Sequence, residues 1–339
     1  WQHLFIVDED ALEERVEGIR KSKPNTTARY RALQALYYLS CSEGNRLTMV
    51  DHIGLVRVLV RGLKNARNGG REQLTILMIL RNLSVPPDNK DEITKLAGEV
   101  LIAVCWGVED QTCKEKAIGT LVNLSADRDS ALSLVELGVI EIAILLVKTT
   151  STAQATRAPG MQQFRAMGGM LLYNLCMIRN LRKRLRDNEA IELLQTMLAE
   201  RNMLGLLSTI AIMHLIGTER EHPLLVFNER QENLPNIVNC FRLSIAGKPM
   251  YGLMWNPRHL VEAMGTLILF PTNKRTLAKL GVDEVLTKGT KVCRHDEYAC
   301  NVMKELRNQL QPVLRRLSMQ AAPISPQTQP SEGSGTHYL

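Results

Sequence analysis

The chain has 339 residues, of which 45% are hydrophobic, 23% charged and only 4% aromatic. This apolar content excludes a mostly disordered chain, and the scarcity of aromatic residues favours helices over strands. The formal net charge of +7 is a small excess of 42 basic over 35 acidic residues, so we do not expect a nucleic acid as the partner.

The cysteines form an odd set of seven without a CxxC pair, and several of them lie within apolar runs. This pattern indicates free thiols in a reducing compartment, so we expect a cytoplasmic protein, with the nucleus as a second location. No apolar stretch reaches the ~18 residues that a membrane span requires. No secretory signal is visible.

In chain order, the first predicted elements are a helix over residues 8–23 and another over 27–40, with 2–7 as the remnant of a short helix before them. The second of these helices ends in a short cluster that recurs along the chain, with its last residue preceded by Leu. The six copies, whose ends lie 40 to 52 residues apart, are Leu36–Ser40, Leu80–Ser84, Leu121–Ser125, Leu172–Cys176, Ile212–Ile216 and Met264–Ile268.

Apolar or small residues stand eight, four and one residues before the end of each cluster, which is the spacing of one helix face. Nine residues after it, five copies again have an apolar residue. Gly138 and Gly281 lie thirteen residues after it, and Gly54 and Gly98 lie fourteen after it. We interpret these glycines as bends between a short first helix and a second helix, with the cluster ending a third. Because one such unit cannot bury its own apolar stripe, neighbouring units must stack.

Two units are longer because of inserts rich in helix breakers, at 149–160 and 246–257, and the stretch 298–317 is predicted to be a last helix that caps the array. We therefore assign 1–310 to a repeat array that begins within a unit, 311–319 to the end of the capping helix, and 320–339 to a disordered tail.

The units resemble armadillo repeats over roughly residues 5–310, in the Leu-x-Asn-Leu-Ser ending, the Asn five residues later and the Gly before an Ile-rich helix. The clearest copies are 117–147 and 261–286. The resemblance implies an all-α, right-handed superhelical armadillo-type solenoid, whose third helices line a concave groove for an extended segment of a partner protein. HEAT repeats have a similar helical logic but lack the Asn-Leu-Ser signature.

In armadillo proteins an Asn near the end of each third helix binds the backbone of the peptide. The resemblance transfers this role to Asn82, Asn123 and Asn174, with Tyr38, His214 and Thr266 at the same place in other units and with Arg81 and Tyr173 as neighbours that add specificity. The alternative is that each Asn bonds backbone at a helix end. Importin-like repeats have Trp four residues before that Asn, where this chain has Met78, Gly119 and Met170, so the units look catenin-like.

Two further motifs carry hypotheses about modification and binding. The basic run Arg179, Arg182, Lys183, Arg184 and Arg186 is either a solvated helix or a patch for nuclear import or phosphate. Ser318 follows two arginines, as in basophilic-kinase substrates, and Ser325 precedes a proline. Both are candidate phosphorylation sites.

No catalytic, cofactor-binding or metal-binding motif is present, and Cys293, His295 and Cys300 lack a fourth ligand for zinc. We therefore expect a protein-binding adaptor or scaffold rather than an enzyme. The alternatives are a structural or regulatory segment of a larger multidomain protein, and a basic surface that binds RNA or acidic lipid. The sequence does not predict the oligomeric state.

Overall fold

The computed structural model describes residues 8–52, 54–150, 160–217, 222–227 and 233–321. These parts are helical, and the isolated bridge between Met250 and Leu253 is their only β-type pairing. The expected all-α fold is therefore present. The remnant helix at 2–7, most of the insert 149–160, Ser325 and nearly all of the predicted tail lie outside the described residues.

The chain divides into two compact units, unit 1 at Trp1–His222 and unit 2 at Pro223–Leu339. The assignment of 1–310 to one repeat array stays a prediction. Each unit is described by itself.

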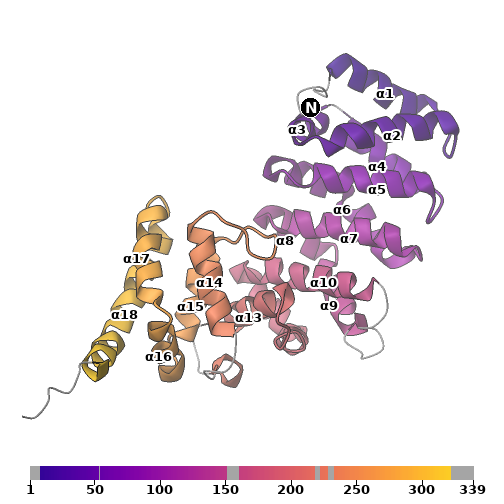
Figure 1. Cartoon of the computed structure of the whole chain (residues 1–339). Helices are drawn as coiled ribbons and strands as arrows, with labels where there is room; N and C mark the ends of the chain where they lie inside the picture. The colour runs from indigo at the N-terminus through magenta and orange to yellow at the C-terminus, as the bar shows by residue number, and fades with distance from the viewer. Residues whose placement is uncertain (1–7, 53, 151–159, 218–221, 228–232, 322–339) are drawn as a thin grey trace, which may run out of the picture. The chain divides into compact units, whose positions relative to one another are not determined.

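Unit 1 contains two rows of helices in which each helix packs against the next member of its row (Figure 1). The second helices form one row: α1 (Glu9–Lys21), α4 (Leu55–Asn65), α6 (Lys90–Gly107), α9 (Val139–Thr150) and α12 (Ala190–Gln195). The third helices form the other: α2 (Thr27–Cys41), α5 (Arg71–Leu83), α7 (Gln111–Ser125), α10 (Met161–Cys176) and α13 (Met203–Ile216). Short first helices connect the rows: α3 (Arg46–Asp51), α8 (Arg128–Glu136) and α11 (Arg182–Asp187).

The apolar positions of the repeat are the core of the structure. The residue four before the end of the cluster is buried in all six copies, from Leu36 to Met264. All five apolar residues nine positions after the cluster are also buried, namely Met49, Ile93, Leu134, Leu185 and Leu277. Because these residues come from third and first helices of successive units, their burial requires the units to stack.

Three of the four glycines act as the predicted bends. Gly54, Gly138 and Gly281 each have a positive φ, at 94°, 98° and 72°, and each precedes a second helix. Gly98 does not follow this prediction, because α6 continues through it and joins the first and second helices of its unit. Leu137 of the next unit packs there, so that a Cβ on Gly98 would lie 3.0 Å from its Cδ1 atom.

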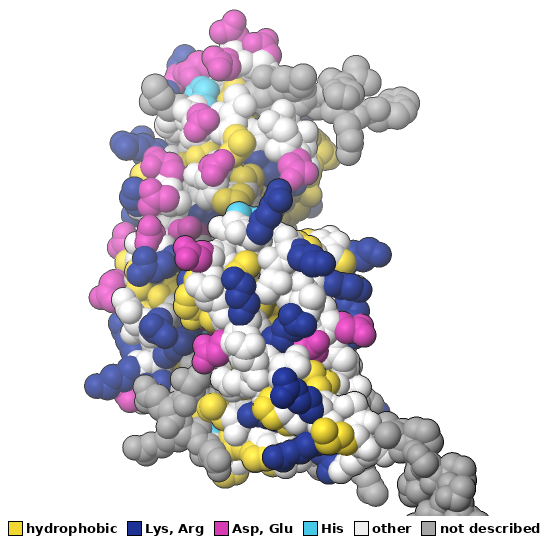
Figure 2. Space-filling view, turned by 90° about the vertical axis from the view of Figure 1, so that its left-hand side faces the viewer, with side chains coloured by type: hydrophobic (Ala, Val, Ile, Leu, Met, Phe, Trp, Pro, Cys, Tyr) yellow, Lys and Arg dark blue, Asp and Glu magenta, His cyan; other side chains and the backbone are white. Residues whose placement is uncertain are grey.

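Unit 2 repeats the same arrangement over five helices. α14 (Asn233–Ile245) packs against α17 (Val282–Val292), and α15 (Pro257–Leu267) packs against α18 (Glu297–Ala321), with the first helix α16 (Pro271–Lys279) between them in sequence. α18 is longer at both ends than the predicted helix. Figure 2 shows Lys and Arg side chains scattered singly among uncharged ones on a face of this unit.

No single helix in the described ranges is long and apolar enough to cross a membrane. The bent pair α8 and α9, which meet at 82°, passes this test only when joined. Its apolar residues are largely buried in the core, Ala131, Leu134, Ile140 and Ala143 among them.

Candidate peptide-binding face

The three predicted asparagines join successive third helices through a ladder of hydrogen bonds. In each case the side-chain amide nitrogen Nδ2 donates to a serine hydroxyl of the preceding unit at 3.0 Å: Asn82 to Ser40, Asn123 to Ser84, and Asn174 to Ser125. Asn123 and Asn174 also donate to a backbone carbonyl of that unit, at 3.3 and 3.1 Å. The asparagines thus bond helix ends, but those of the neighbouring unit rather than their own.

The serine that ends each of the first three clusters explains why the ladder forms. Its hydroxyl donates to the carbonyl three residues earlier in its own helix, as Ser84 does to Arg81 at 2.8 Å, and is then free to accept from the next Asn. Where the cluster ends in Cys176, a weak acceptor, the following unit has His214 instead of Asn. The residue at the Asn position therefore changes together with its acceptor.

His214 departs from the prediction that it contributes to an exposed binding surface. It is only 4% exposed, and its Nδ1 atom accepts a hydrogen bond from Nη2 of Arg182 at 3.0 Å. The same guanidinium donates through Nε to the carbonyl of Cys176 at 2.9 Å. Arg182 thus takes over the contact that Asn and Ser make elsewhere, and His214 is a packing residue.

One atom of each asparagine remains available. The Oδ1 atoms of Asn82, Asn123 and Asn174 accept no hydrogen bond from any residue that the structure describes, and the three side chains are half-buried. An unused amide oxygen can accept the N–H of an extended chain. We call the surface formed by Tyr38, Arg81, Asn82, Asn123, Tyr173 and Asn174 the third-helix face.

The neighbours of the asparagines give this face an aromatic end and a charged middle. Tyr38 is 63% exposed, and its ring lies 5.6 Å from that of Tyr37. Burial raises the pKa of Tyr37, so this phenol stays protonated over the physiological range. Arg81 pairs with Glu115 at 3.4 Å, while Tyr173 is half-buried.

Gly119 occupies a position where importin-like repeats have Trp, and the structure shows what replaces the indole ring. The guanidinium of Arg81 lies over Gly119, so that a Cβ there would be 2.9 Å from Nε of Arg81. An arginine of the preceding unit therefore covers the site where an aromatic wall would stand.

A second set of asparagines, five residues after the cluster, closes the turn from third helix to first helix. Nδ2 of Asn89 donates to the carbonyls of Leu83 and Arg46, both at 2.9 Å, and is buried. Asn273 does the same in unit 2 towards Leu225 and Leu267, at 2.6 and 3.3 Å. These residues join units but offer no surface to a ligand.

Two buried arginines, which the sequence analysis did not single out, hold the ends of second helices. Arg165 is 7% exposed, and it donates to the carbonyls of Thr150 and Thr196 and pairs with Glu200 at 3.1 Å. Arg29 donates to the carbonyl of Ile19 and pairs with the buried Glu72, each at 2.6 Å. Both arginines stand eleven residues before the end of their cluster. This shared position in the repeat is the sequence pattern that could have identified them.

The basic run at 179–186 is used largely for packing. Arg182 bonds Cys176 and His214, Arg186 donates to the carbonyl of Leu215 at 2.7 Å, and Arg184 pairs with Glu136 at 3.3 Å. Three of its five cations therefore have intramolecular partners, so it is not a free cationic patch.

Ser318 is exposed near the end of α18, and its hydroxyl donates to the carbonyl of Arg315 at 2.8 Å. A kinase that binds an extended substrate would have to unwind the last turns of this helix. Phosphorylation at Ser318 stays a prediction.

Within the described ranges, no group of three or more Cys, His, Asp or Glu side chains is arranged to hold a metal ion. Cys293 and Cys300 are buried, and the thiol of Cys300 contacts the carbonyl of Cys293 at 3.2 Å.

No protein-family model and no curated protein matches the chain. Among solved structures, an engineered protein of the Northeast Structural Genomics Consortium matches with a TM-score of 0.55 and 15% identity, over 90% of this chain and 68% of its own. A chain from a structure on a phosphorylation switch in the interaction between cadherin and beta-catenin matches with a TM-score of 0.51 and 17% identity, over 91% of this chain and 55% of its own.

A designed armadillo repeat protein is also similar over 89% of this chain, with 12% identity and a TM-score of 0.48. The two likenesses above 0.5 concern the fold alone. Together with the two rows of helices and the repeat register, they show that this chain has an armadillo-type helical repeat fold.

Proposed function

We propose that the protein is an adaptor or scaffold that holds an extended segment of a partner protein on the third-helix face of unit 1. The observation that carries this proposal is the row of three half-buried asparagines, each fixed through Nδ2 and each with an unused Oδ1 atom. Because the ladder fixes the orientation of each amide, binding a peptide would require little loss of side-chain freedom.

The same reasoning favours catenin-like over importin-like recognition. Importin-like pockets for Lys side chains need aromatic walls, whereas here Arg81 covers Gly119 and the corresponding positions on α5 and α10 hold Met78 and Met170. Without such walls, this part of the face lacks a pocket of that kind for a Lys side chain. We therefore propose that the segment is not a basic import signal. A cytoplasmic location, with the nucleus as a second one, fits the seven free thiols of the chain.

The test begins by selecting linear peptides from a random displayed library on the full chain and measuring their dissociation constants by fluorescence anisotropy. Tyr38→Ala should weaken binding at least tenfold, because Tyr38 is the most exposed aromatic residue of the face. The matched control is Trp106→Ala, which removes an exposed aromatic residue from the second-helix row and should leave affinity unchanged.

N-methylation of single backbone nitrogens in a selected peptide then tests the role of the Oδ1 atoms. Methylation should weaken binding strongly at the positions that donate to asparagine and little at the others, because it removes one N–H at a time. Peptides that lose affinity with Trp106→Ala but not with Tyr38→Ala, or that tolerate methylation everywhere, would show that the third-helix face is not the binding site. Failure to select any peptide would favour the structural or regulatory alternative.

A further inference from the structure

A second surface of unit 1, separate from the third-helix face, gathers cations that have no partners. Arg57, Arg61 and Lys64 lie on α4 at the spacing i, i+4, i+7, so their Cβ atoms project from one stripe about 10 Å long. All three side chains are exposed, and none forms an ion pair or hydrogen bond with any residue that the structure describes. We call them the α4 stripe.

Several other exposed cations of unit 1 form ion pairs, whereas the three cations of the α4 stripe form none with any described residue. Lys95 pairs with Asp91 at 2.5 Å, Lys148 with Glu189 at 2.7 Å and Arg184 with Glu136 at 3.3 Å. The segment 52–71 contains no Asp or Glu but five cations, because Arg67 follows in the loop after α4 and Arg71 begins α5. Unbalanced charge of one sign creates a local positive potential that attracts anions.

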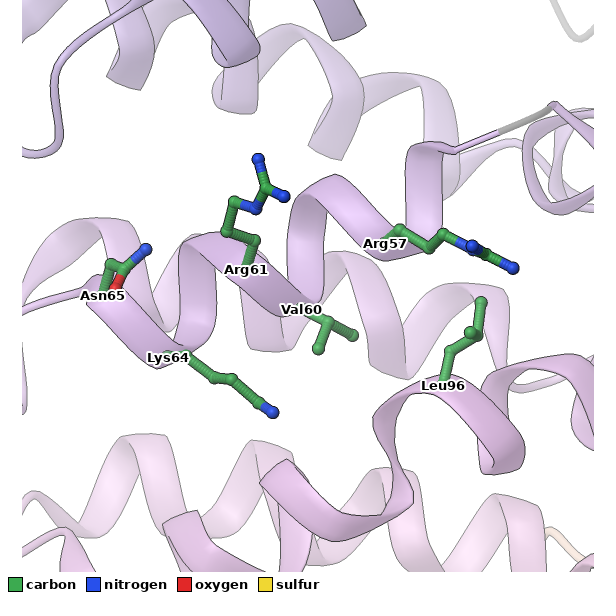
Figure 3. Close-up of a pocket in the computed structure, with 6 residues that line it drawn as sticks. All are labelled: Arg57, Val60, Arg61, Lys64, Asn65 and Leu96. Atoms are coloured by element: carbon green, nitrogen blue, oxygen red, sulfur yellow. The ribbon is translucent and has the colours of Figure 1, made fainter.

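The surface beside the stripe is hollowed and has an apolar floor. A hollow of about 390 Å³ between α4 and α6 is lined by the stripe together with Val60, Asn65 and Leu96. Figure 3 shows Val60 and Lys64 pointing from α4 toward α6, with Leu96 rising from α6 to meet them and Arg57 extending at one end. Arg61 points to the opposite side in that view, although it is among the residues that line the hollow.

The residues that line this hollow include no Asp or Glu. Asp51 and Glu92 line a neighbouring hollow of about 480 Å³, which the first shares at Arg57 and Leu96. Arg61 and Lys64 do not line that neighbouring hollow, and Lys64 also stabilises the last turn of α4 through the helix dipole.

We infer that the hollow between α4 and α6 binds an acidic amphipathic helix of a partner protein. Carboxylates one and two turns apart on such a helix would face the cations of the stripe, and an apolar side chain between them would pack on Val60 and Leu96. The linear spacing and the apolar floor favour this partner over a flat lipid surface or a nucleic acid, neither of which has alternating charged and apolar side chains.

The probe is a labelled synthetic peptide with Glu at i, i+4 and i+7 and Leu at i+3, compared with a scrambled peptide of the same composition. Binding to the full chain is measured by fluorescence anisotropy at low and at physiological ionic strength. Wild-type protein should bind the patterned peptide more tightly than the scrambled one, and the affinity should fall as salt rises.

The triple variant Arg57→Glu/Arg61→Glu/Lys64→Glu should weaken binding at least tenfold, and the neutral triple Arg57→Gln/Arg61→Gln/Lys64→Gln should weaken it less. The matched control reverses three other exposed cations of unit 1 without ion pairs, Arg128, Arg179 and Lys183, and should change affinity less than twofold. Circular dichroism and melting curves show whether each variant is folded. If the Glu triple variant does not fold, the Gln triple variant still tests the inference.

The apolar floor is tested by a cycle of two changes, Leu96→Ala in the protein and Leu→Ala in the peptide. Each change alone should weaken binding, and the second should add little once the first is made. The inference is wrong if the patterned peptide does not bind, if the control triple weakens it equally, or if the scrambled peptide binds as well. It is also wrong if phosphatidylserine vesicles or single-stranded RNA bind the α4 stripe more tightly than the peptide does.

Discussion

At the scale of single residues, the same amino acid has different roles according to what the neighbouring unit places beside it. Asn123 spans two units because Ser84 supplies an acceptor, whereas His214 at the same register is buried against Arg182. The role of a repeat position in this protein therefore depends on a pair of residues in successive units. A substitution at one residue of the pair should change the hydrogen bonding of the other.

We expect Asn123→Ala to lower the free energy of unfolding by about 1–2 kcal/mol, because the hydroxyl of Ser84 and the carbonyl of Arg81 lose their shared donor. Urea denaturation followed by circular dichroism measures this. Asn68→Ala, which removes an exposed side chain without a hydrogen-bond partner in the described ranges, should change stability by less than about 0.5 kcal/mol. Equal effects of the two variants would refute the ladder.

Glu189 stands where two other units have the bending glycine, and its φ is 62°. Because a side chain is strained in this region, Glu189→Gly should raise the melting temperature by about 1–3 °C. Glu189→Ala is the control, since it also removes the pair with Lys148 but keeps the strain, and should not raise it. A melting temperature that rises equally in both would mean that the ion pair, not the backbone, was unfavourable.

At the scale of elements, charged groups at helix ends decide how second and third helices meet. Arg165 and Arg29 lie near the start of third helices, yet each reaches carbonyls at the end of a second helix. Carbonyls at a helix end lack intrahelical partners and carry partial negative charge, so an arginine there satisfies both needs.

Arg165→Met should cost about 3–5 kcal/mol of unfolding free energy, because it leaves Glu200 without its partner and the carbonyls of Thr150 and Thr196 without a donor. Arg179→Met, at an exposed arginine without such contacts, should cost less than about 0.5 kcal/mol. Chemical denaturation of both variants measures this difference. Similar denaturation midpoints would contradict the stabilising role of the buried Arg165.

At the scale of the whole molecule, the stacking of small units buries nearly every thiol. Burial raises the pKa of Cys105, Cys113 and Cys240 to about 12, and it also raises the pKa values of Cys176 and Cys293. Cys41 alone among the seven is exposed. A buried thiol with a raised pKa supplies almost no thiolate at neutral pH and is chemically inert.

We therefore expect a thiol reagent such as DTNB to label one cysteine rapidly in the native protein, and all seven only after denaturation. Cys41→Ser should abolish the fast phase. Any fast thiol that remains in this variant would mean that the units open more readily than their packing suggests.

The raised pKa values of the buried thiols also predict a loss of stability at alkaline pH. An ordinary thiol has a pKa of 9.0, so above that pH the unfolded chain releases protons that the folded chain retains up to about pH 12. Unfolding is then favoured more strongly as the pH rises, while stability is unaffected by these groups below pH 9. Denaturation midpoints measured between pH 8 and 11 should fall, and less steeply in Cys240→Ala.

Much of the fold could be predicted because helix faces and bends are local patterns. The residues four before and nine after each cluster end are buried as expected, and Gly54, Gly138 and Gly281 adopt the bend. Gly98 was wrong as a bend because glycine permits a left-handed turn but does not enforce one, and good helix formers surround it.

The sequence predicted which residues form the candidate site, but not their hydrogen bonds. The register placed Asn82, Asn123 and Asn174 on successive third helices, but a hydrogen bond from Nδ2 to a serine about 40 residues earlier depends on how the units stack, which no local pattern encodes. The α4 stripe was missed for the same reason, since a run of cations is recognised as unpaired only when its neighbours are known.

Periodic burial of apolar side chains is a property of each segment, and it was sufficient to establish helices, repeat units and their stacking from the amino-acid order alone. Which polar groups become neighbours is a property of the stack. The structure was needed to show that the asparagines clamp adjacent units and that His214 is buried. It was also needed to show that, among the described residues, Arg57, Arg61 and Lys64 have no ion-pair partner and the asparagine Oδ1 atoms have no donor. The physical reason is range: helix periodicity acts over a few residues, whereas hydrogen bonds and ion pairs depend on side chains that only folding brings together.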